Sequence, residues 1–129
     1  MILVADDNID VRNLLFESLT MFGYEVILAV DGQDAVERFA AHADSIRLVL
    51  MDVIMPRKNG IQSCREIMQL RSDTKVLLLS GYAAEILDDP TVLNGGVELV
   101  KKPFSPVALA EKIRIMLDDR GKGIDAPTA

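Results

Sequence analysis

Five short apolar runs recur along the chain, and each is continuous rather than alternating. The runs are Ile2–Ala5, Val26–Val30, Leu48–Met51, Val76–Leu79 and the weaker Val97–Val100. A strand with water on one face alternates apolar and polar residues, whereas a continuous run indicates that both faces are covered. The pattern therefore predicts the buried strands of a parallel sheet flanked by helices.

The segments between these runs repeat apolar residues at three- and four-residue steps, which is the spacing of one helix face. The stripes are Val11, Leu14, Leu15, Ser18, Leu19 and Phe22; Ala35, Val36, Phe39 and Ala40; Ile61, Cys64, Ile67 and Met68; and Leu109, Ile113, Met116 and Leu117. Asn8 is the expected cap of the first helix, and Gly23 is the expected glycine beyond its end. The stretch 82–96 contains Pro90, so only a short helix, Ala83 to Asp88, is expected there.

Strands and helices thus alternate along the chain, and right-handed crossovers turn that order into a doubly wound sheet. We predict an α/β, flavodoxin-like fold, in which five parallel strands follow the order 2-1-3-4-5 with helices on both faces. One domain is expected over residues 1–118, because 129 residues leave no room for two ordinary cores. Residues 119–129 are polar and are expected to form a flexible C-terminal tail.

Composition narrows the function classes. Fourteen basic residues against 20 acidic ones give a formal net charge of −6, so the cation excess that drives non-specific binding to nucleic acid is missing. A single cysteine excludes a disulfide framework and a multi-cysteine zinc site. No apolar run approaches the roughly 20 residues of a membrane span, and the N-terminus lacks the features of a signal peptide. We expect a cytoplasmic protein without direct nucleic-acid binding.

Polar residues stand where the apolar runs end, which is where doubly wound sheets bind their ligands. The first run ends in Asp6 and Asp7, the third in Asp52, the fourth in Ser80, and the fifth leads to Lys102. Two carboxylates about 4 Å apart repel by roughly 4 kcal/mol at an effective dielectric constant near 20, so the acidic group requires a cation. Mg²⁺ suits oxygen ligands and leaves positions open for a phosphoryl group. The set predicts a phosphoryl-transfer site with a carboxylate nucleophile.

This ordered set resembles the receiver domain of two-component response regulators. The resemblance covers Ile2 to about Leu117 and also rests on Met55-Pro56, Gly60 and Pro103-Phe104. It implies a phosphorelay domain of the chemotaxis-regulator type, or of the type fused to hybrid histidine kinases, which catalyses only its own phosphorylation and dephosphorylation. The implied phosphodonor is the phosphohistidine of a histidine kinase or of a histidine phosphotransfer protein, and Asp52 is the implied acceptor.

The resemblance also assigns the metal ligands. Asp7, Asp52 and the backbone carbonyl of Ile54 are implied to bind Mg²⁺ directly, while Asp6 acts largely through water. Phe16 lies outside the first helical stripe. We favour a partly covered surface aromatic there over the alternative, a docking contact for the phosphodonor, which in this family lies near the first helix.

The switch is assigned in the same way. Ser80 and Lys102 are implied to contact the phosphoryl oxygens, and the new negative charge draws Ser80 inward. In this family an aromatic residue on the fifth strand often follows. Leu99 stands at that position here, so Tyr82 is expected to supply the moving ring instead. The surface expected to change, and to bind a downstream protein, is formed by the fourth helix, the fifth strand and the last helix.

Three alternatives stay open at this point. A flavodoxin-like mononucleotide binder shares the fold but needs a Gly-, Ser- or Thr-rich phosphate loop where this chain has Asp6-Asp7-Asn8. An aspartate-nucleophile phosphatase needs a general acid where Ile54 stands. A degenerate receiver would act only as a binding module.

Overall fold

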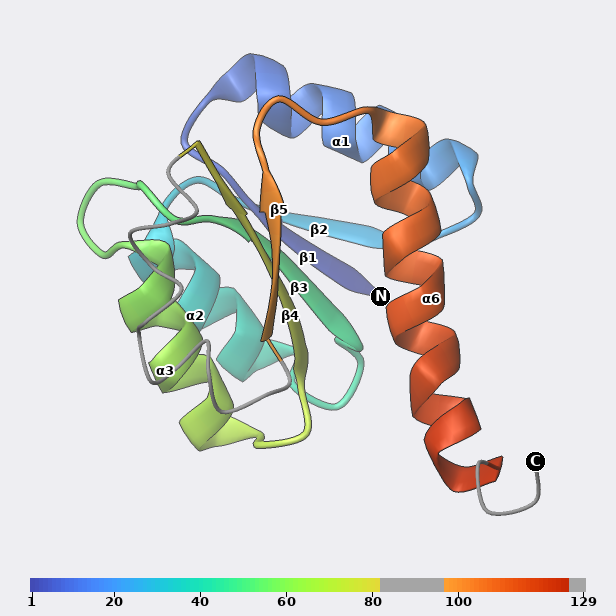
Figure 1. Ribbon diagram of the computed structural model, residues 1–129. Coiled ribbons are helices and arrows are strands. Elements are labelled where there is room, and N and C mark those ends of the chain that lie inside the picture. The colour runs from blue at the N-terminus through green and yellow to red at the C-terminus, as the bar shows by residue number, and fades with distance from the viewer. Residues whose placement is uncertain (82–96, 126–129) are drawn as a thin grey trace.

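The computed structural model describes residues 1–81 and 97–125, with side chains as far as Asp118. The strands are β1 (Ile2–Ala5), β2 (Val26–Ala29), β3 (Leu48–Asp52), β4 (Lys75–Ser80) and β5 (Val97–Lys101), and the helices are α1 (Ile9–Met21), α2 (Gly32–Ala41), α3 (Gly60–Leu70) and α6 (Pro106–Asp125) (Figure 1). The expected helix Ala83–Asp88 lies outside the described residues. None of the helices in the described ranges combines the length and the apolar character that crossing a membrane requires.

The strands form one parallel sheet in the order β2-β1-β3-β4-β5, so the predicted fold class is confirmed. The order of strands along the sheet reverses between β1 and β3, and in such folds ligands bind outside the carboxyl ends of the strands at this position. Ala5 pairs with Met51 across these two strands. The residues that follow them, Asp6 and Asp52, therefore emerge side by side.

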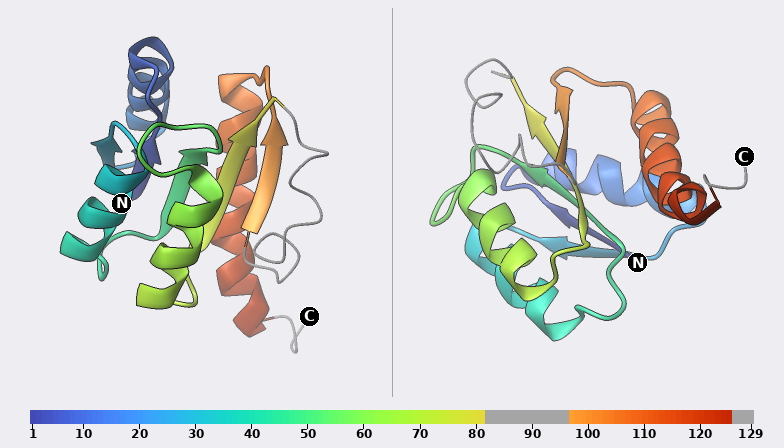
Figure 2. Two further views of the ribbon diagram at one scale, coloured as in Figure 1. Left: turned by 90° about the vertical axis from the view of Figure 1, so that its left-hand side faces the viewer. Right: turned by 60° about the horizontal axis from the view of Figure 1, so that its bottom comes forward.

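Helices cover both faces of the sheet, with α1 and α6 on one side and α2 and α3 on the other (Figures 1 and 2). Leu3 packs in the core beneath α2 and α3 with Phe39, while its neighbour Val4 packs in the core beneath α1 and α6 with Leu15. Successive residues of a strand point to opposite faces. Because both faces are covered, every residue of β1 is buried, which accounts for the continuous apolar run.

The ends of α1 follow the predicted signals. The side chain of Asn8 accepts hydrogen bonds from the backbone N–H groups of Asp10 and Val11. Gly23 has a φ of +94°, a conformation that glycine adopts without a steric penalty. The helix therefore begins and ends where its cap residues indicate.

The predicted stripes are wrong at three positions. Leu14 and Phe22 were expected on the buried face of α1, but they are 44% and 49% exposed. Leu15 and Leu19 face the sheet, whereas Leu14 lines a surface hollow with Pro103 and Phe104. Ala40 is also exposed. The buried face of α1 is therefore narrower than the apolar stripe that its sequence carries.

Helix α6 continues to Asp125, beyond the end that its apolar stripe indicates. Once a helix has formed, each further residue adds a hydrogen bond at little cost. Gly121 and Gly123 weaken a helix by about 1 kcal/mol each relative to alanine, and Pro127 is the first residue after them that breaks one. The domain boundary at residue 118 and the flexible tail stay predictions.

Gly60 fixes the distance between α3 and the end of β3. Its N–H donates a hydrogen bond of 2.7 Å to the carbonyl of Val53. A Cβ at this position would overlap the carbonyl oxygen of Asp52 and lie 2.8 Å from the Cα of Val53. The helix therefore approaches the backbone of Asp52 so closely that a side chain has no room.

We expect Gly60→Ala to lower the free energy of unfolding by about 1–3 kcal/mol, because overlap with backbone atoms forces the helix away. Urea unfolding followed by circular dichroism measures the change. Gly81→Ala is the matched control, since a Cβ there meets nothing within 4 Å among the described residues, and it should stay within about 0.5 kcal/mol of the wild type. Equal losses in the two variants would contradict this account of Gly60.

Candidate functional site

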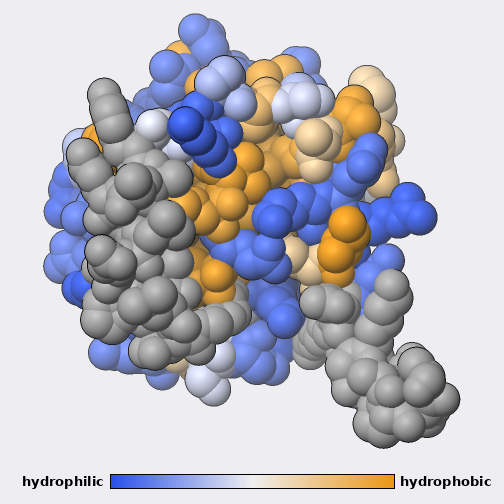
Figure 3. Space-filling model, in the orientation of Figure 1, coloured by the Kyte–Doolittle hydropathy of each residue, from blue (hydrophilic) through white to orange (hydrophobic). Residues whose placement is uncertain are grey.

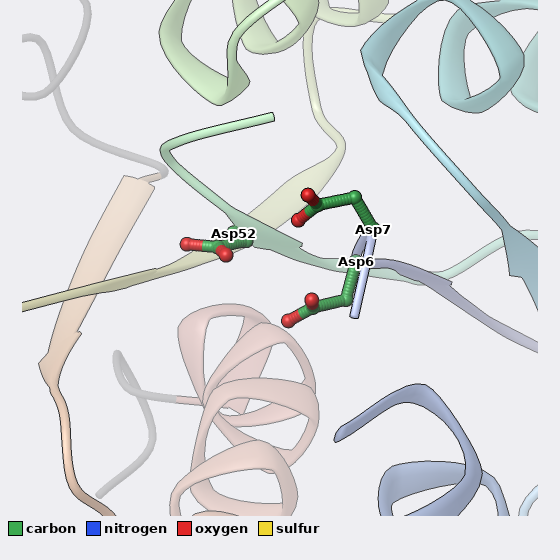
Figure 4. A group of neighbouring side chains, drawn as sticks. All are labelled: Asp6, Asp7 and Asp52. Atoms are coloured by element: carbon green, nitrogen blue, oxygen red, sulfur yellow. The ribbon is translucent and has the colours of Figure 1, made fainter. Parts of the chain in front are cut away.

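Three carboxylates meet at the carboxyl edge of the sheet. Asp6 and Asp7 follow β1, and Asp52 is the last residue of β3. One carboxylate oxygen from each lies within 4.8 Å of the others. Figure 4 shows the three side chains together. Asp6 and Asp52 are buried, whereas Asp7 is exposed. The sheet therefore brings the predicted acidic residues together, with one of them open to solvent.

Lys102 reaches the same group from the loop after β5. Its Nζ donates a hydrogen bond of 3.0 Å to Oδ2 of Asp52. Its backbone N–H donates to the carbonyl of Ser80 at 2.8 Å, which ties this loop to the end of β4. The carboxylate of Asp52 is mostly shielded from water, and a charge pair is stronger there than at the surface.

Asp6 lies at the buried side of the cluster. Its Oδ1 accepts a hydrogen bond of 2.9 Å from the N–H of Asn8, while its buried Oδ2 has no hydrogen-bond partner among the described residues. Burial raises the pKa of the Asp6 carboxyl above its usual 3.8, and the charges of Asp52 and Asp7 raise it further. The Asn8 hydrogen bond and the ammonium of Lys102 act in the opposite direction.

The donor set fits a hard divalent cation. Lys102 offsets one negative charge of a group that contains three carboxylates. Oδ2 of Asp6 is a buried acceptor with no donor among the described residues. Leaving such an oxygen buried costs free energy unless a water or an ion binds to it. Mg²⁺ takes oxygen ligands and retains several waters, so a direct ligand and a water-mediated one are both accommodated.

The other predicted site residues lie around this cluster. Ser80 is buried at the end of β4, the strand next to β3. The N–H of Ile54 faces Oδ1 of Asp52 at 3.4 Å, and the side chain of Ile54 is exposed. Leu99 is partly buried against the core beneath α2 and α3. Tyr82 lies outside the described residues. The roles assigned to these residues stay predictions.

Contacts between the loop after β3 and the start of α2 were missed by sequence reasoning. Nη1 of Arg57 donates to Oδ2 of Asp31 at 3.3 Å. A Cβ on Gly32 would overlap the carbonyl oxygen of Lys58. The adjacent Asp31-Gly32 is a readable helix-start signal, but nothing in the sequence indicates what lies against it.

These features define a flavodoxin-like α/β protein with an acidic, cation-accepting site at the point where the strand order reverses. The model of the response regulator receiver domain matches residues 2–114 of the chain. The chain belongs to this family, and with it to two-component signalling. The predicted family is therefore confirmed.

Two curated relatives illustrate the match. The probable transcriptional regulator ycf27 of Cyanophora paradoxa is 38% identical over 117 residues, which cover 90% of this chain and 47% of that protein. The chemotaxis protein CheY of Treponema pallidum is 34% identical over 117 residues, which cover 90% of this chain and 81% of that protein. The chain thus spans about half the length of the ycf27 regulators that it matches.

Solved structures agree. The response regulator TrrA from Thermotoga maritima, in complex with Mg²⁺ and BeF, has a TM-score of 0.79 and 32% identity, and the match covers 89% of this chain and 96% of that one. The receiver domain of the hybrid histidine kinase CckA has a TM-score of 0.78 and 30% identity, with 90% and 97% covered. A receiver of the expected hybrid-kinase type is thus among the structural neighbours, and one of the expected chemotaxis type is among the curated relatives.

We expect Asp6→Asn to stabilise the protein without Mg²⁺ by on the order of 1 kcal/mol, because the variant removes a buried charge and its amide can donate to a neighbouring carboxylate. The raised pKa of Asp6 means that the folded protein binds the proton more tightly than the unfolded chain. Wild-type stability from this group is therefore present at low pH and is lost as the pH rises through the folded pKa.

The gain from Asp6→Asn should accordingly shrink as the pH is lowered and Asp6 becomes protonated. Urea unfolding in EDTA, from neutral pH down through the pKa of Asp6, measures the difference in stability between the variant and the wild type. Asp10→Asn is the control, because Asp10 lies in the exposed first turn of α1 and should give no gain. A destabilised Asp6→Asn protein at neutral pH would contradict the electrostatic account.

Proposed function

We propose that the chain is a phosphoacceptor, in which Asp52 takes a phosphoryl group from the phosphohistidine of a histidine kinase or a histidine phosphotransfer protein. The observation that carries this proposal is the meeting of three carboxylates with Nζ of Lys102, 3.0 Å from Oδ2 of Asp52. Membership of the receiver family favours this function over a mononucleotide binder or a phosphatase. The presence of acidic residues and lysine together favours it over a receiver that only binds partners.

Metal binding follows from the same cluster. Asp7 and Asp52, with the backbone carbonyl of Ile54, hold Mg²⁺ directly, and Asp6 acts through water. The orphaned oxygen of Asp6 and the complex of the related TrrA with Mg²⁺ and BeF support this assignment. When bound, the metal neutralises the charge on the transferring phosphoryl oxygens.

The transfer itself needs a nucleophile and charge compensation. A carboxylate oxygen of Asp52 attacks phosphorus, the bond from phosphorus to the histidine nitrogen breaks, and its electron pair stays on that nitrogen. Lys102 then pairs with a phosphoryl oxygen, and the hydroxyl of Ser80 donates to another. The product is an acyl phosphate on Asp52, whose added charge moves Ser80 and the loop after it.

The phosphodonor docks on α1, and the exposed apolar residues of this helix favour that role for Phe16 over the plain surface aromatic expected from the sequence. This helix buries Leu15 and Leu19 against the sheet, yet Ile9 and Phe16 on the rest of its surface are exposed, Phe16 to 39%. They are seven residues apart and so share one face of the helix, which begins beside the acidic cluster. A helix with apolar residues on a second face is typical of a surface that a partner covers.

The output surface includes β5 and α6, and the fourth helix that the family resemblance predicts for it lies outside the described residues. Figure 3 shows apolar side chains gathered in the middle of this face. Val100 is only partly buried, and Ile115 on α6 is exposed. Glu98 and Lys112 pair across β5 and α6 at 2.7 Å. An apolar centre beside charged groups suits a downstream protein partner.

Intact-mass analysis tests the phosphoacceptor function. With Mg²⁺ and acetyl phosphate, the wild-type chain should gain the mass of one phosphoryl group, because acetyl phosphate is itself an acyl phosphate donor. Asp52→Asn lacks the nucleophile and should gain none, and EDTA should prevent the gain in the wild type. Modification of Asp52→Asn at the wild-type rate would refute the assignment.

Phe16→Ala tests donor docking. It should slow transfer from a phosphorylated histidine phosphotransfer protein by about tenfold or more, the cost of losing a buried aromatic contact, and leave phosphorylation by acetyl phosphate unchanged. Quench-flow and phosphate-affinity gels measure both rates. Met21→Ala, which removes an exposed side chain at the far end of α1, is the control. Equal slowing with both donors would place Phe16 in folding rather than docking.

A further inference from the structure

The loop of residues 53–59, here called the β3–α3 loop, is attached to α2 through a side chain that adopts an unfavourable backbone conformation. Arg57 has a φ of +66°, where residues with a Cβ are disfavoured and Gly or Asn is the usual choice. Its guanidinium donates to Oδ2 of Asp31 at 3.3 Å. An arginine at such a position indicates that its side chain contributes something that Gly or Asn cannot.

Asp31 is a rigid anchor for that contact. It is the N-cap of α2, and its Oδ1 accepts a hydrogen bond of 2.7 Å from the N–H of Asp34. Its side chain is 8% exposed, whereas that of Arg57 is 61% exposed. Because the carboxylate is buried and fixed by the helix, the ion pair restrains the arginine and the loop that carries it.

A second observation places the same two segments in contact. The carbonyl oxygen of Lys58 approaches Gly32 so closely that a Cβ there would overlap it. The loop backbone therefore lies directly on the first residue of α2. The ion pair and this backbone contact lie next to each other in both segments.

The other end of the loop belongs to the metal site. The N–H of Val53 donates to the carbonyl of Leu79 at 3.0 Å, and the N–H of Ile54 faces the carboxylate of Asp52. Residues 53–56 alone separate Asp52 from Arg57. The restraint at Arg57 thus acts on the segment that contains the Ile54 carbonyl.

We propose that Arg57 is a positioning residue, which holds the β3–α3 loop through Asp31 and so sets the affinity of the acidic site for Mg²⁺. This inference rests on the proposed function, in which the Ile54 carbonyl is a ligand. The pair lies outside the acidic cluster of Asp6, Asp7 and Asp52. Residues that orient a ligand through another group commonly alter metal affinity when they are replaced.

Mg²⁺ titration by isothermal calorimetry tests the proposal with Arg57→Asn, Asp31→Asn and the double variant. Asn tolerates the backbone of residue 57, and at position 31 it caps a helix as well as Asp does. Each single variant should raise the Kd for Mg²⁺ by about threefold or more. The double variant should be no weaker than the singles, because all three remove one interaction.

If the two substitutions acted only through the charge that they remove, the shifts in the Kd for Mg²⁺ would differ from those expected here. Loss of the positive Arg57 would tighten Mg²⁺ binding and loss of the negative Asp31 would weaken it, whereas the proposal requires both to weaken it. Arg38→Asn is the matched control, because the pair of Arg38 with Asp34 at 3.2 Å lies on the exposed side of the same helix. Its Kd should remain at the wild-type value.

The outcomes separate the two proposals. If the wild type binds Mg²⁺ and the variants bind it equally well, the pair serves stability alone and the inference is overturned. Opposite shifts for Arg57→Asn and Asp31→Asn would overturn it as well. If the wild type takes up neither Mg²⁺ nor a phosphoryl group, the proposed function fails, and the inference fails with it.

Discussion

Asp6, Asp7 and Asp52 are held close together against the repulsion of their charges, and the packing of the sheet supplies the force that holds them. Asp6 follows a strand that is buried along its whole length, and Asp52 ends another. Neither can move away without disturbing both apolar layers. Lys102 offsets one of these negative charges, so the site is prepared to receive further positive charge.

Lys102 links the acidic cluster to the carboxyl ends of the neighbouring strands. Its ammonium meets Asp52 from β3, while its backbone meets Ser80 from β4, and its own position follows β5. A change in the charge of Asp52 therefore acts on groups at the ends of three neighbouring strands. We infer that this junction is how chemistry at Asp52 becomes a change of surface along β5 and α6, since the ion pair must rearrange when a phosphoryl group enters.

The fold and the acidic cluster were predictable because both follow from local patterns. A continuous apolar run identifies a strand covered on both faces, and parallel strands all deliver their next residues to one edge. The pairing of Arg57 with Asp31 was not predictable, because it joins residues 26 positions apart through a backbone conformation that no propensity favours. Leu14 was placed wrongly for a related reason, since periodicity gives a helix face but not the width that a neighbouring element covers.

Two glycines let the β3–α3 loop pack closely against the starts of α2 and α3. Gly60 lets the start of α3 approach the carbonyl of Asp52, and Gly32 lets the start of α2 approach the carbonyl of Lys58. The loop is therefore held at both ends by the first residues of helices. The residues that set the site thus extend beyond its charged groups to the backbone contacts that only glycine permits.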